Sequence, residues 1–158
     1  MKIGILSDSH DNVPMVDAAV AAFRERGVEH VIHAGDFVAP FAAKRLSPLD
    51  VPVIAVFGNC DGEHTVLSAV LPGIVSGARH ETIDGKRFVI VHAAEWLSDE
   101  DRRAAEVIVC GHTHEAQIDN SGPLLINPGE CGGWVTGRAT AAVLDTETMS
   151  PELIELSP

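Results

Sequence analysis

The chain has 158 residues, of which 46% are hydrophobic, and this size and composition are typical of one folded domain rather than a disordered segment. Its 11 basic and 23 acidic side chains give a formal net charge of −12, which argues against a broad phosphate-binding surface for nucleic acid. Only 4% of the residues are aromatic and none is tyrosine, so a stacking platform for long single strands is also disfavoured.

The N-terminus and the cysteines predict a cytoplasmic protein. Asp8 interrupts the N-terminal apolar run too early for a signal peptide, and no apolar run approaches the roughly 18 residues of a membrane helix. The three cysteines are widely spaced and form no Cys-x-x-Cys pair, which fits a reducing compartment better than a disulfide framework. We therefore expect no membrane span and a cytoplasmic location.

The first half of the chain alternates predicted strands and helices. Short apolar runs predict buried strands at residues 3–7, 28–34 and 51–57. Between them, apolar residues at helical spacing predict one helix from Pro14 to about Arg26 and a shorter one ending near Leu46. This order of strands and helices favours a parallel sheet.

The second half contains a hairpin and several short strands. Asp84-Gly85 supplies the positive φ angles of a two-residue turn between strands at 81–83 and 86–91. A helix is expected around 98–106 and a short strand at 107–110, followed by mostly antiparallel strands at 115–119, 124–126, 138–145 and 152–156. We therefore predict an α/β fold of two packed mixed β-sheets flanked by helices, an α-β-β-α sandwich, forming a single domain over 1–158.

Seven polar side chains directly follow predicted strands, and they are Asp8, His10, Asp36, Asn59, His92, His112 and His114. Ligands of open α/β sheets bind beyond the carboxyl ends of the strands, so we expect these side chains to meet at one edge. Seven unrelated surface groups would not share this position. Two carboxylates, one amide oxygen and four imidazoles suit Mn, Fe, Ni, Co or Zn better than Ca. Seven ligands exceed the needs of one ion, so two ions about 3.5–4 Å apart are expected.

These residues form motifs that resemble the five ordered blocks of the calcineurin-like metallophosphoesterase superfamily, particularly its small single-domain phosphodiesterase branch. The blocks are Asp8-x-His10, Gly35-Asp36, Gly58-Asn59, His92 and Gly111-His112-Thr113-His114, and the match runs from residue 3 to about 145. The run Asn127-Pro128-Gly129-Glu130-Cys131-Gly132 is also similar to small archaeal members, although neither Glu130 nor Cys131 is assigned a role.

The resemblance implies two metal sites that share one carboxylate. Asp8, His10, Asp36 and His114 would hold one ion, and Asp36, Asn59, His92 and His112 the other, with Asp36 as the bridge. Manganese is the expected metal, with Ni, Fe, Co or Zn as alternatives. A hydroxide between the ions would attack phosphorus in line, and the catalytic residues would be Asp36 and His10, which lies where it could contact the leaving group.

Two positions depart from the family pattern. Cys60 stands where many relatives have a histidine that helps to protonate the leaving oxygen, and nearby cations would favour its thiolate over the acidic thiol. Either another group supplies the proton or the substrate has a good leaving group. His64 is a candidate for the proton donor, although its preferred interpretation is an exposed loop residue. His92 is followed by Ala93-Ala94, where relatives often have Gly and a further His, so the substrate contacts on that rim differ.

Other polar residues are given structural interpretations. His33 is interpreted as a strand residue with satisfied nitrogens, in preference to one that orients a ligand. Asp11, Asn12 and Asp61 are interpreted as helix-capping and loop residues. Cys110 is interpreted as a buried core thiol, and Arg138 as a solvated strand residue.

The leading functional hypothesis is a dinuclear metal-dependent phosphoesterase that acts on a small phosphorylated substrate, more specifically a diester. Two divalent cations would outweigh the two ligand carboxylates, so the site would be cationic although the chain is acidic. The alternative is a non-catalytic protein-interaction module of the same fold, as in the vacuolar-sorting subunit of retromer, whose metal site is incomplete. A complete ligand set favours the enzyme. No extended nucleic-acid surface and no membrane contact are expected, and a homo-oligomer such as a dimer stays open.

Overall fold

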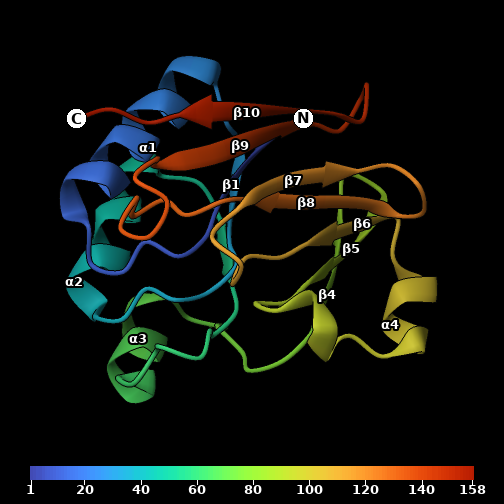
Figure 1. Ribbon diagram of the computed structural model, residues 1–158, viewed down its shortest axis with the longest axis horizontal. Coiled ribbons are helices and arrows are strands. Elements are labelled where there is room, and N and C mark those ends of the chain that lie inside the picture. Colours follow the sequence, from blue (N-terminus) through green and yellow to red (C-terminus); the bar gives the residue numbers. More distant parts are fainter.

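The computed structural model describes residues 1–158, and its first sheet contains both the N-terminal and the C-terminal strand of the chain (Figure 1). The strand order is β10 (Ser150–Glu155), β9 (Thr140–Asp145), β1 (Lys2–Leu6), β2 (His30–His33) and β3 (Val53–Ala55). Strands β1, β2 and β3 are parallel, whereas β9 pairs antiparallel with both β1 and β10. The C-terminal hairpin therefore completes the sheet that the N-terminal strand begins.

The second sheet has a parallel centre with antiparallel edges. Its order is β4 (Arg79–Ile83), β5 (Lys86–Ile90), β6 (Val107–Val109), β8 (Leu124–Pro128) and β7 (Ala116–Asp119). Strands β5, β6 and β8 pair in parallel, while β4 and β7 pair antiparallel at the two edges. Asp84 and Gly85 adopt φ angles of 50° and 72°, which confirms the predicted hairpin turn.

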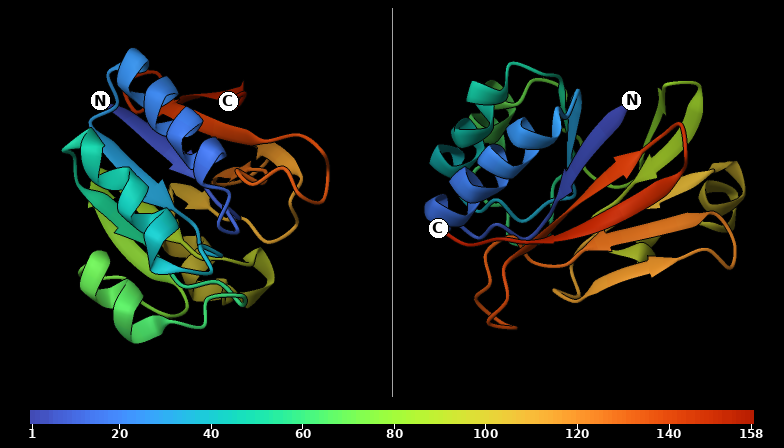
Figure 2. Two further views of the ribbon diagram at one scale, coloured as in Figure 1. Left: turned by 90° about the vertical axis from the view of Figure 1, so that its left-hand side faces the viewer. Right: turned by 90° about the horizontal axis from the view of Figure 1, so that it is seen from above.

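Helices cover the outer faces of both sheets (Figure 2). The first sheet is covered by α1 (Val13–Arg26), α2 (Pro40–Ala43) with a 3-10 turn at Lys44–Leu49, and α3 (His64–Val70). The second carries α4 (Asp99–Ala104) and a 3-10 turn at Ala94–Trp96. The helix α1 packs tightly, because a Cβ atom added at Gly4 of β1 would lie 2.8 Å from the Phe23 ring.

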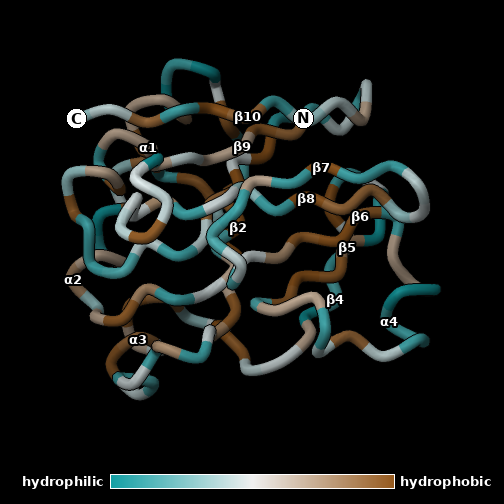
Figure 3. The backbone as a smooth tube through the Cα atoms, in the orientation of Figure 1, coloured by the Kyte–Doolittle hydropathy of each residue, from teal (hydrophilic) through white to brown (hydrophobic).

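Apolar residues fill the space between the two sheets, as the brown central strands of Figure 3 indicate. In β1 the side chains of Ile3 and Ile5 point into this inter-sheet core, whereas Leu6 belongs to the layer beneath the helices. Both faces of β1 are therefore buried, which explains why its sequence is continuously apolar rather than alternating. The predicted sandwich of two mixed sheets flanked by helices is confirmed.

Several local expectations were wrong. The residue at the N-cap of α1 is Asn12, but its side chain donates to the Gly132 carbonyl at 2.7 Å instead of capping the helix. Asp11 does not cap it either, because its carboxylate accepts from the Ala39 N–H at 2.9 Å. His64 begins α3 rather than lying in a loop. The strands after residue 115 are mostly antiparallel, as predicted, with the β6–β8 pair as the parallel exception. No helix in the structure combines the length and apolar character needed to span a bilayer.

Candidate metal centre

The seven predicted ligands lie in loops that follow strands of both sheets. Backbone hydrogen bonds hold the loops against one another, from Asp8 N to Gly35 O at 3.0 Å, from Gly111 N to His92 O at 2.8 Å and from Cys131 N to Ser7 O at 2.8 Å. Five of the seven ligands have positive φ angles, namely Asp8, His10, Asp36, His112 and His114. Such left-handed backbone is costly for residues other than glycine and clusters at functional sites. The loops are therefore folded to aim these side chains rather than to minimise local strain.

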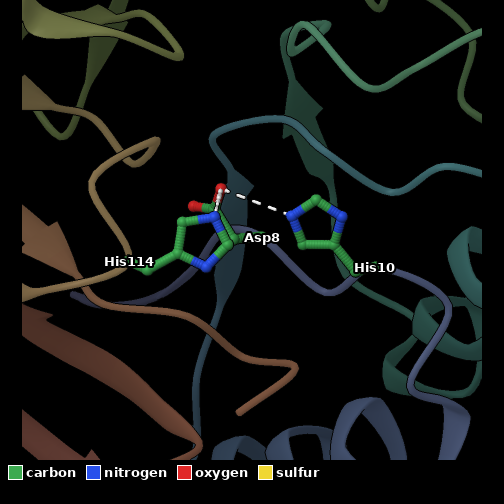
Figure 4. A group of neighbouring side chains, drawn as sticks. All are labelled: Asp8, His10 and His114. Atoms are coloured by element: carbon green, nitrogen blue, oxygen red, sulfur yellow. Dashed lines mark ion pairs between the residues drawn. The ribbon is translucent and has the colours of Figure 1, made fainter. Parts of the chain in front are cut away.

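Asp8, His10 and His114 form the first group of converging ligands. The two imidazoles point at the same Asp8 oxygen (Figure 4), with Oδ1 lying 3.8 Å from His10 Nε2 and 3.6 Å from His114 Nε2. Asp8 Oδ1 and His10 Nε2 are buried and have no hydrogen-bond partner. Buried polar atoms without a partner are rare because they cost free energy, so this pair points to a bound group between them.

Asp36, His92 and Asn59 form the second group. His92 Nδ1 donates to the Ala34 carbonyl at 2.8 Å, which leaves the lone pair of a neutral imidazole on Nε2. That nitrogen faces Asn59 Oδ1 at 3.0 Å and Asp36 Oδ2 at 3.4 Å. In this tautomer none of the three atoms carries a hydrogen to share. Asp36 Oδ2 also lies 3.5 Å from His10 Nε2, so one carboxylate oxygen adjoins both groups.

These separations fit divalent cations. Two ligand atoms that each lie about 2.1 Å from one ion are themselves about 3–4 Å apart. Clusters suited to an ion are formed by Asp8, His10 and His114, by Asp8, Asp36 and His92, and by His10, Asp36 and Cys60. Carboxylate oxygens and imidazole nitrogens together suit transition metals.

His112 is the predicted ligand whose imidazole does not reach either group. Its side chain is 37% exposed, and its Nε2 lies 3.7 Å from Glu95 Oε1. The ring contacts His92 edge-on at a centroid distance of 5.1 Å, and the backbone N–H donates to Asp8 Oδ2 at 3.1 Å. The backbone of His112 therefore fixes Asp8, while its imidazole stands at the rim.

The glycines of the motifs are explained by close approach. A Cβ atom at Gly58 would collide with the Asp36 carboxyl group, and one at Gly111 would collide with the side chains of Ser7 and Asp8. Glycine at these positions lets neighbouring loops close around the ligand carboxylates.

Glu130 is a site residue that the sequence did not assign. Its buried carboxylate accepts from His114 Nδ1 at 3.0 Å, from the backbone N–H groups of Trp134, Val135 and Thr136, and from the Thr136 hydroxyl. Burial raises the pKa of Glu130, but the hydrogen bonds from His114 and Thr136 outweigh it and lower the pKa to about 2. Its bond to Nδ1 turns His114 Nε2 toward Asp8. The only signal in the sequence was the run around 127–132.

Asp61 is more than the loop residue that was predicted. Its Oδ2 accepts from the N–H groups of Asp36 at 3.0 Å and Gly58 at 2.8 Å, and its Oδ1 accepts from Val38 at 2.8 Å. It is buried and ties two of the ligand loops together. The donors come from two loops, at Asp36 and Val38 and at Gly58, that are distant in sequence, so local pattern could not reveal their common partner.

His33 and Cys110 have the structural roles that the sequence predicts. His33 is a buried strand residue with both nitrogens satisfied, because Nδ1 accepts from Gly35 N at 3.2 Å and Nε2 lies 3.1 Å from Ser9 Oγ. Burial lowers its pKa to about 3. Cys110 is a buried core thiol, as predicted. Arg138 is solvated and pairs with Glu155 at 3.4 Å, although it precedes β9 rather than lying within it. A cleft of about 490 Å³ beside Arg138 includes, of the seven predicted metal ligands, only His114.

Cys60 adjoins Asp36, and we expect its thiol to react slowly. Its backbone N–H donates to Asp36 Oδ1 at 2.8 Å. Partial burial and the Asp36 carboxylate raise the pKa of the Cys60 thiol to about 11, while burial raises those of Cys110 and Cys131 to about 12. In metal-free protein we therefore expect alkylation at Cys60 alone. At pH 8 its rate should be about 100-fold lower than that of a thiol with a pKa of 9.0. The rate should then rise about tenfold with each pH unit up to about pH 11.

The measurement is mass-resolved alkylation of native, chelator-treated protein across this pH range, with Cys60→Ser as the control that should take up no label. Labelling as fast as that of a free cysteine would contradict the raised pKa.

The chain is similar in sequence and in structure to known phosphoesterases. A family model described as the calcineurin-like phosphoesterase superfamily domain matches residues 1–149. The chain is 39% identical to Phosphodiesterase MJ0936 of Methanocaldococcus jannaschii over 156 residues, which cover 93% of this chain and 94% of that protein. A solved structure of an archaeal phosphodiesterase has a TM-score of 0.91 at 38% identity, over 99% of this chain and 100% of that one. Vps29 of Chaetomium thermophilum, with a TM-score of 0.70 at 13% identity over 100% of both chains, shares the fold.

Proposed function

Because this chain belongs to the calcineurin-like phosphoesterase superfamily, we propose that it is a dinuclear metal-dependent phosphodiesterase. The observation that carries the proposal is the convergence of ligand atoms around Asp36 Oδ2, 3.5 Å from His10 Nε2 and 3.4 Å from His92 Nε2. Asp8 Oδ1 and His10 Nε2 have no hydrogen-bond partner, which supports a cation bound by the first group of ligands. Related proteins that carry the name phosphodiesterase support a diester as substrate.

In this proposal each side chain has a stated role. One ion is held by Asp8, His10, Asp36 and His114, and the other by Asp36, Asn59, His92 and His112. Asp36 is the bridge, since its Oδ2 adjoins both groups. The imidazole of His112 would turn from Glu95 toward the second ion, a movement that its partial exposure allows.

The proposed reaction is in-line displacement at phosphorus. Two divalent cations would supply a hydroxide nucleophile at neutral pH and offset the charge that grows on the phosphoryl oxygens. Burial raises the pKa of Asp36, but the neighbouring His92 imidazole and the hydrogen bond from the Cys60 N–H outweigh it, so the pKa lies well below its ordinary value and the carboxylate stays ionised. The imidazole of His10 is one-fifth exposed and would contact the leaving group.

The proposal also includes the extent of the domain, the metal, the substrate class and the location of the protein. Residues 1–158 would act as one metallophosphoesterase domain, with manganese as the favoured metal and Ni, Fe, Co or Zn as alternatives. The substrate would be a small phosphorylated molecule, because the net charge of −12 disfavours a long polyanion. Three free cysteines support a cytoplasmic location, and a homo-oligomer such as a dimer is compatible with the site.

The direct test is hydrolysis of bis(p-nitrophenyl) phosphate and p-nitrophenyl phosphate with added manganese. We expect faster cleavage of the diester and loss of activity when a chelator removes the metal. His92→Ala should lower the diester rate at least about 100-fold, because it removes a ligand whose position Ala34 fixes. His80→Ala is the matched control, since His80 is half exposed and pairs with Asp101.

Activity that survives the chelator, or an unchanged rate in His92→Ala, would contradict the proposal. Failure to bind metal together with absence of hydrolysis would favour the rival, a protein-interaction module of the same fold.

A further inference from the structure

Both tryptophans of the chain lie exposed beside the candidate metal centre. Trp96 is 48% exposed and Trp134 is 65% exposed. By contrast, four of the five phenylalanines are buried in the core, namely Phe23, Phe37, Phe57 and Phe88. Tryptophan is highly buried on average in folded proteins, and aromatic rings left at a surface are typical of recognition sites.

Each tryptophan is fixed to a different half of the ligand set. Trp96 ends the 3-10 turn after β5, with its ring centroid 5.7 Å from that of His92 and 6.1 Å from that of His112. Trp134 lies in the loop after β8, where its backbone N–H donates to Glu130 at 2.9 Å and its Nε1–H donates to the His10 carbonyl at 3.1 Å. One ring therefore stands beside the His92 and His112 imidazoles and the other beside His10.

We propose that these two rings are stacking surfaces for nucleobases, so that the substrate is a short nucleotide phosphodiester. This inference rests on the proposed function and names its substrate class. The polar edge of Trp134 is already bonded to His10, so what it offers a ligand is its apolar face. Every nucleobase has a planar π-face and stacks on such rings whatever its sequence.

Charge limits the length and the type of the ligand. Glu95, the neighbour of Trp96, holds a carboxylate oxygen 3.7 Å from His112 Nε2 and would repel a second phosphate, whereas it tolerates an uncharged base. With 11 basic against 23 acidic side chains, the chain cannot track a long phosphate backbone. A single phosphate at the cations with a base on one or both sides satisfies both limits.

The absence of tyrosine makes the test sharp, because fluorescence excited selectively in tryptophan comes from these two rings alone. Protein loaded with Zn²⁺, an ion without redox chemistry, is titrated with adenosine 5′-monophosphate and with ribose 5-phosphate, which carries the same phosphate but no base. Calorimetry measures both affinities. We expect the nucleotide to bind about tenfold more tightly and to quench the fluorescence, as stacking of one base predicts.

The double variant Trp96→Ala/Trp134→Ala should lose this preference and keep its affinity for ribose 5-phosphate. Replacing both residues by phenylalanine should restore most of the preference. Phe41→Ala is the matched control, because Phe41 is exposed and makes no ring contact with a ligand histidine. The preference should be unchanged in this variant.

Equal affinities of the wild type for the two probes, or an unchanged preference in the double alanine variant, would overturn the inference and leave the proposed function standing. A double variant that keeps the preference but changes its mass in solution would show that the rings join copies of the chain, which also overturns it. Failure of both probes to bind the zinc-loaded protein would count against the proposed function and the inference together.

Discussion

Asp36→Asn is expected to lower the diester hydrolysis rate at least about a thousandfold, equivalent to about 4 kcal/mol of activation free energy. Asp36 Oδ2 is the one carboxylate oxygen that adjoins both His10 Nε2, at 3.5 Å, and His92 Nε2, at 3.4 Å. An amide has the same shape but only one oxygen. If that oxygen accepts from Cys60 N, as Asp36 Oδ1 does at 2.8 Å, the NH₂ group faces the cations.

The metal content of Asp36→Asn should fall from about two ions per chain to about one or fewer, while the far-UV circular dichroism spectrum stays that of the wild type. Both are measured on protein purified with manganese and without chelators. Asp17→Asn is the matched control, because Asp17 is exposed and pairs with Arg45 at 2.6 Å, and loss of such a pair costs at most about 1 kcal/mol. A variant with two ions per chain and a rate near that of the wild type would contradict the role of Asp36 as the bridge.

That most of the proposed ligands lie close together could be predicted, because one physical rule governs their positions. Asp8, Asp36 and His92 each end a buried apolar run, and parallel strands place such ends at a common edge. The two-sheet class followed from the same runs, and the turn at Asp84-Gly85 followed from its φ requirement. These features depend on local sequence.

Residues that act through tertiary contacts could not be predicted. Asp11 and Asn12 stand where helix caps usually stand, yet they bond to Ala39 and Gly132 from other parts of the chain. Asp61 and Glu130 look like ordinary loop acids, and only the folded loops show that each gathers several buried donors. A tertiary partner overrides a local preference, and the sequence pattern does not encode which partner that is.

Composition also misled on aromatic residues. An aromatic content of 4% argues against an extended stacking platform for long strands. A percentage does not reveal that Trp96 and Trp134 both lie beside the proposed ligands. Two well-placed rings are enough for one small substrate.

Glu130→Gln should weaken both the fold and the metal site, although it changes only a single oxygen to an NH₂ group. The carboxylate accepts from His114 Nδ1, the Thr136 hydroxyl and three backbone N–H groups, and it is fully buried. Glutamine has one acceptor oxygen, so its NH₂ group would face a buried donor. We expect a loss of about 2–4 kcal/mol in the free energy of unfolding, since hydrogen bonds to a charged group are lost and a donor is left unpaired.

The same change should lower the affinity for the ion held by His114 by about 10–100-fold, because Nδ1 loses the carboxylate that orients its ring. Calorimetric titration of metal-free protein with Mn²⁺ measures this. Glu155→Gln is the matched control, since Glu155 is exposed and pairs only with Arg138. Unaltered metal affinity in Glu130→Gln would show that Glu130 does not position His114.

The pH dependence separates the charge of Glu130 from its shape. The pKa of Glu130 is lowered in the folded state from 4.5 to about 2, so its contribution to stability is fully present above pH 4.5 and is lost as the pH falls toward 2. Urea unfolding of metal-free protein at a series of pH values measures the free energy of unfolding. The difference in this free energy between wild type and Glu130→Gln should therefore be constant above about pH 5 and should decrease toward zero below it. A free-energy difference that stays constant down to pH 2 would mean that the shape of the Glu130 side chain, rather than its charge, is stabilising. Disappearance of the difference at low pH would show that the ionised carboxylate organises the loop that carries Trp134 and fixes His114.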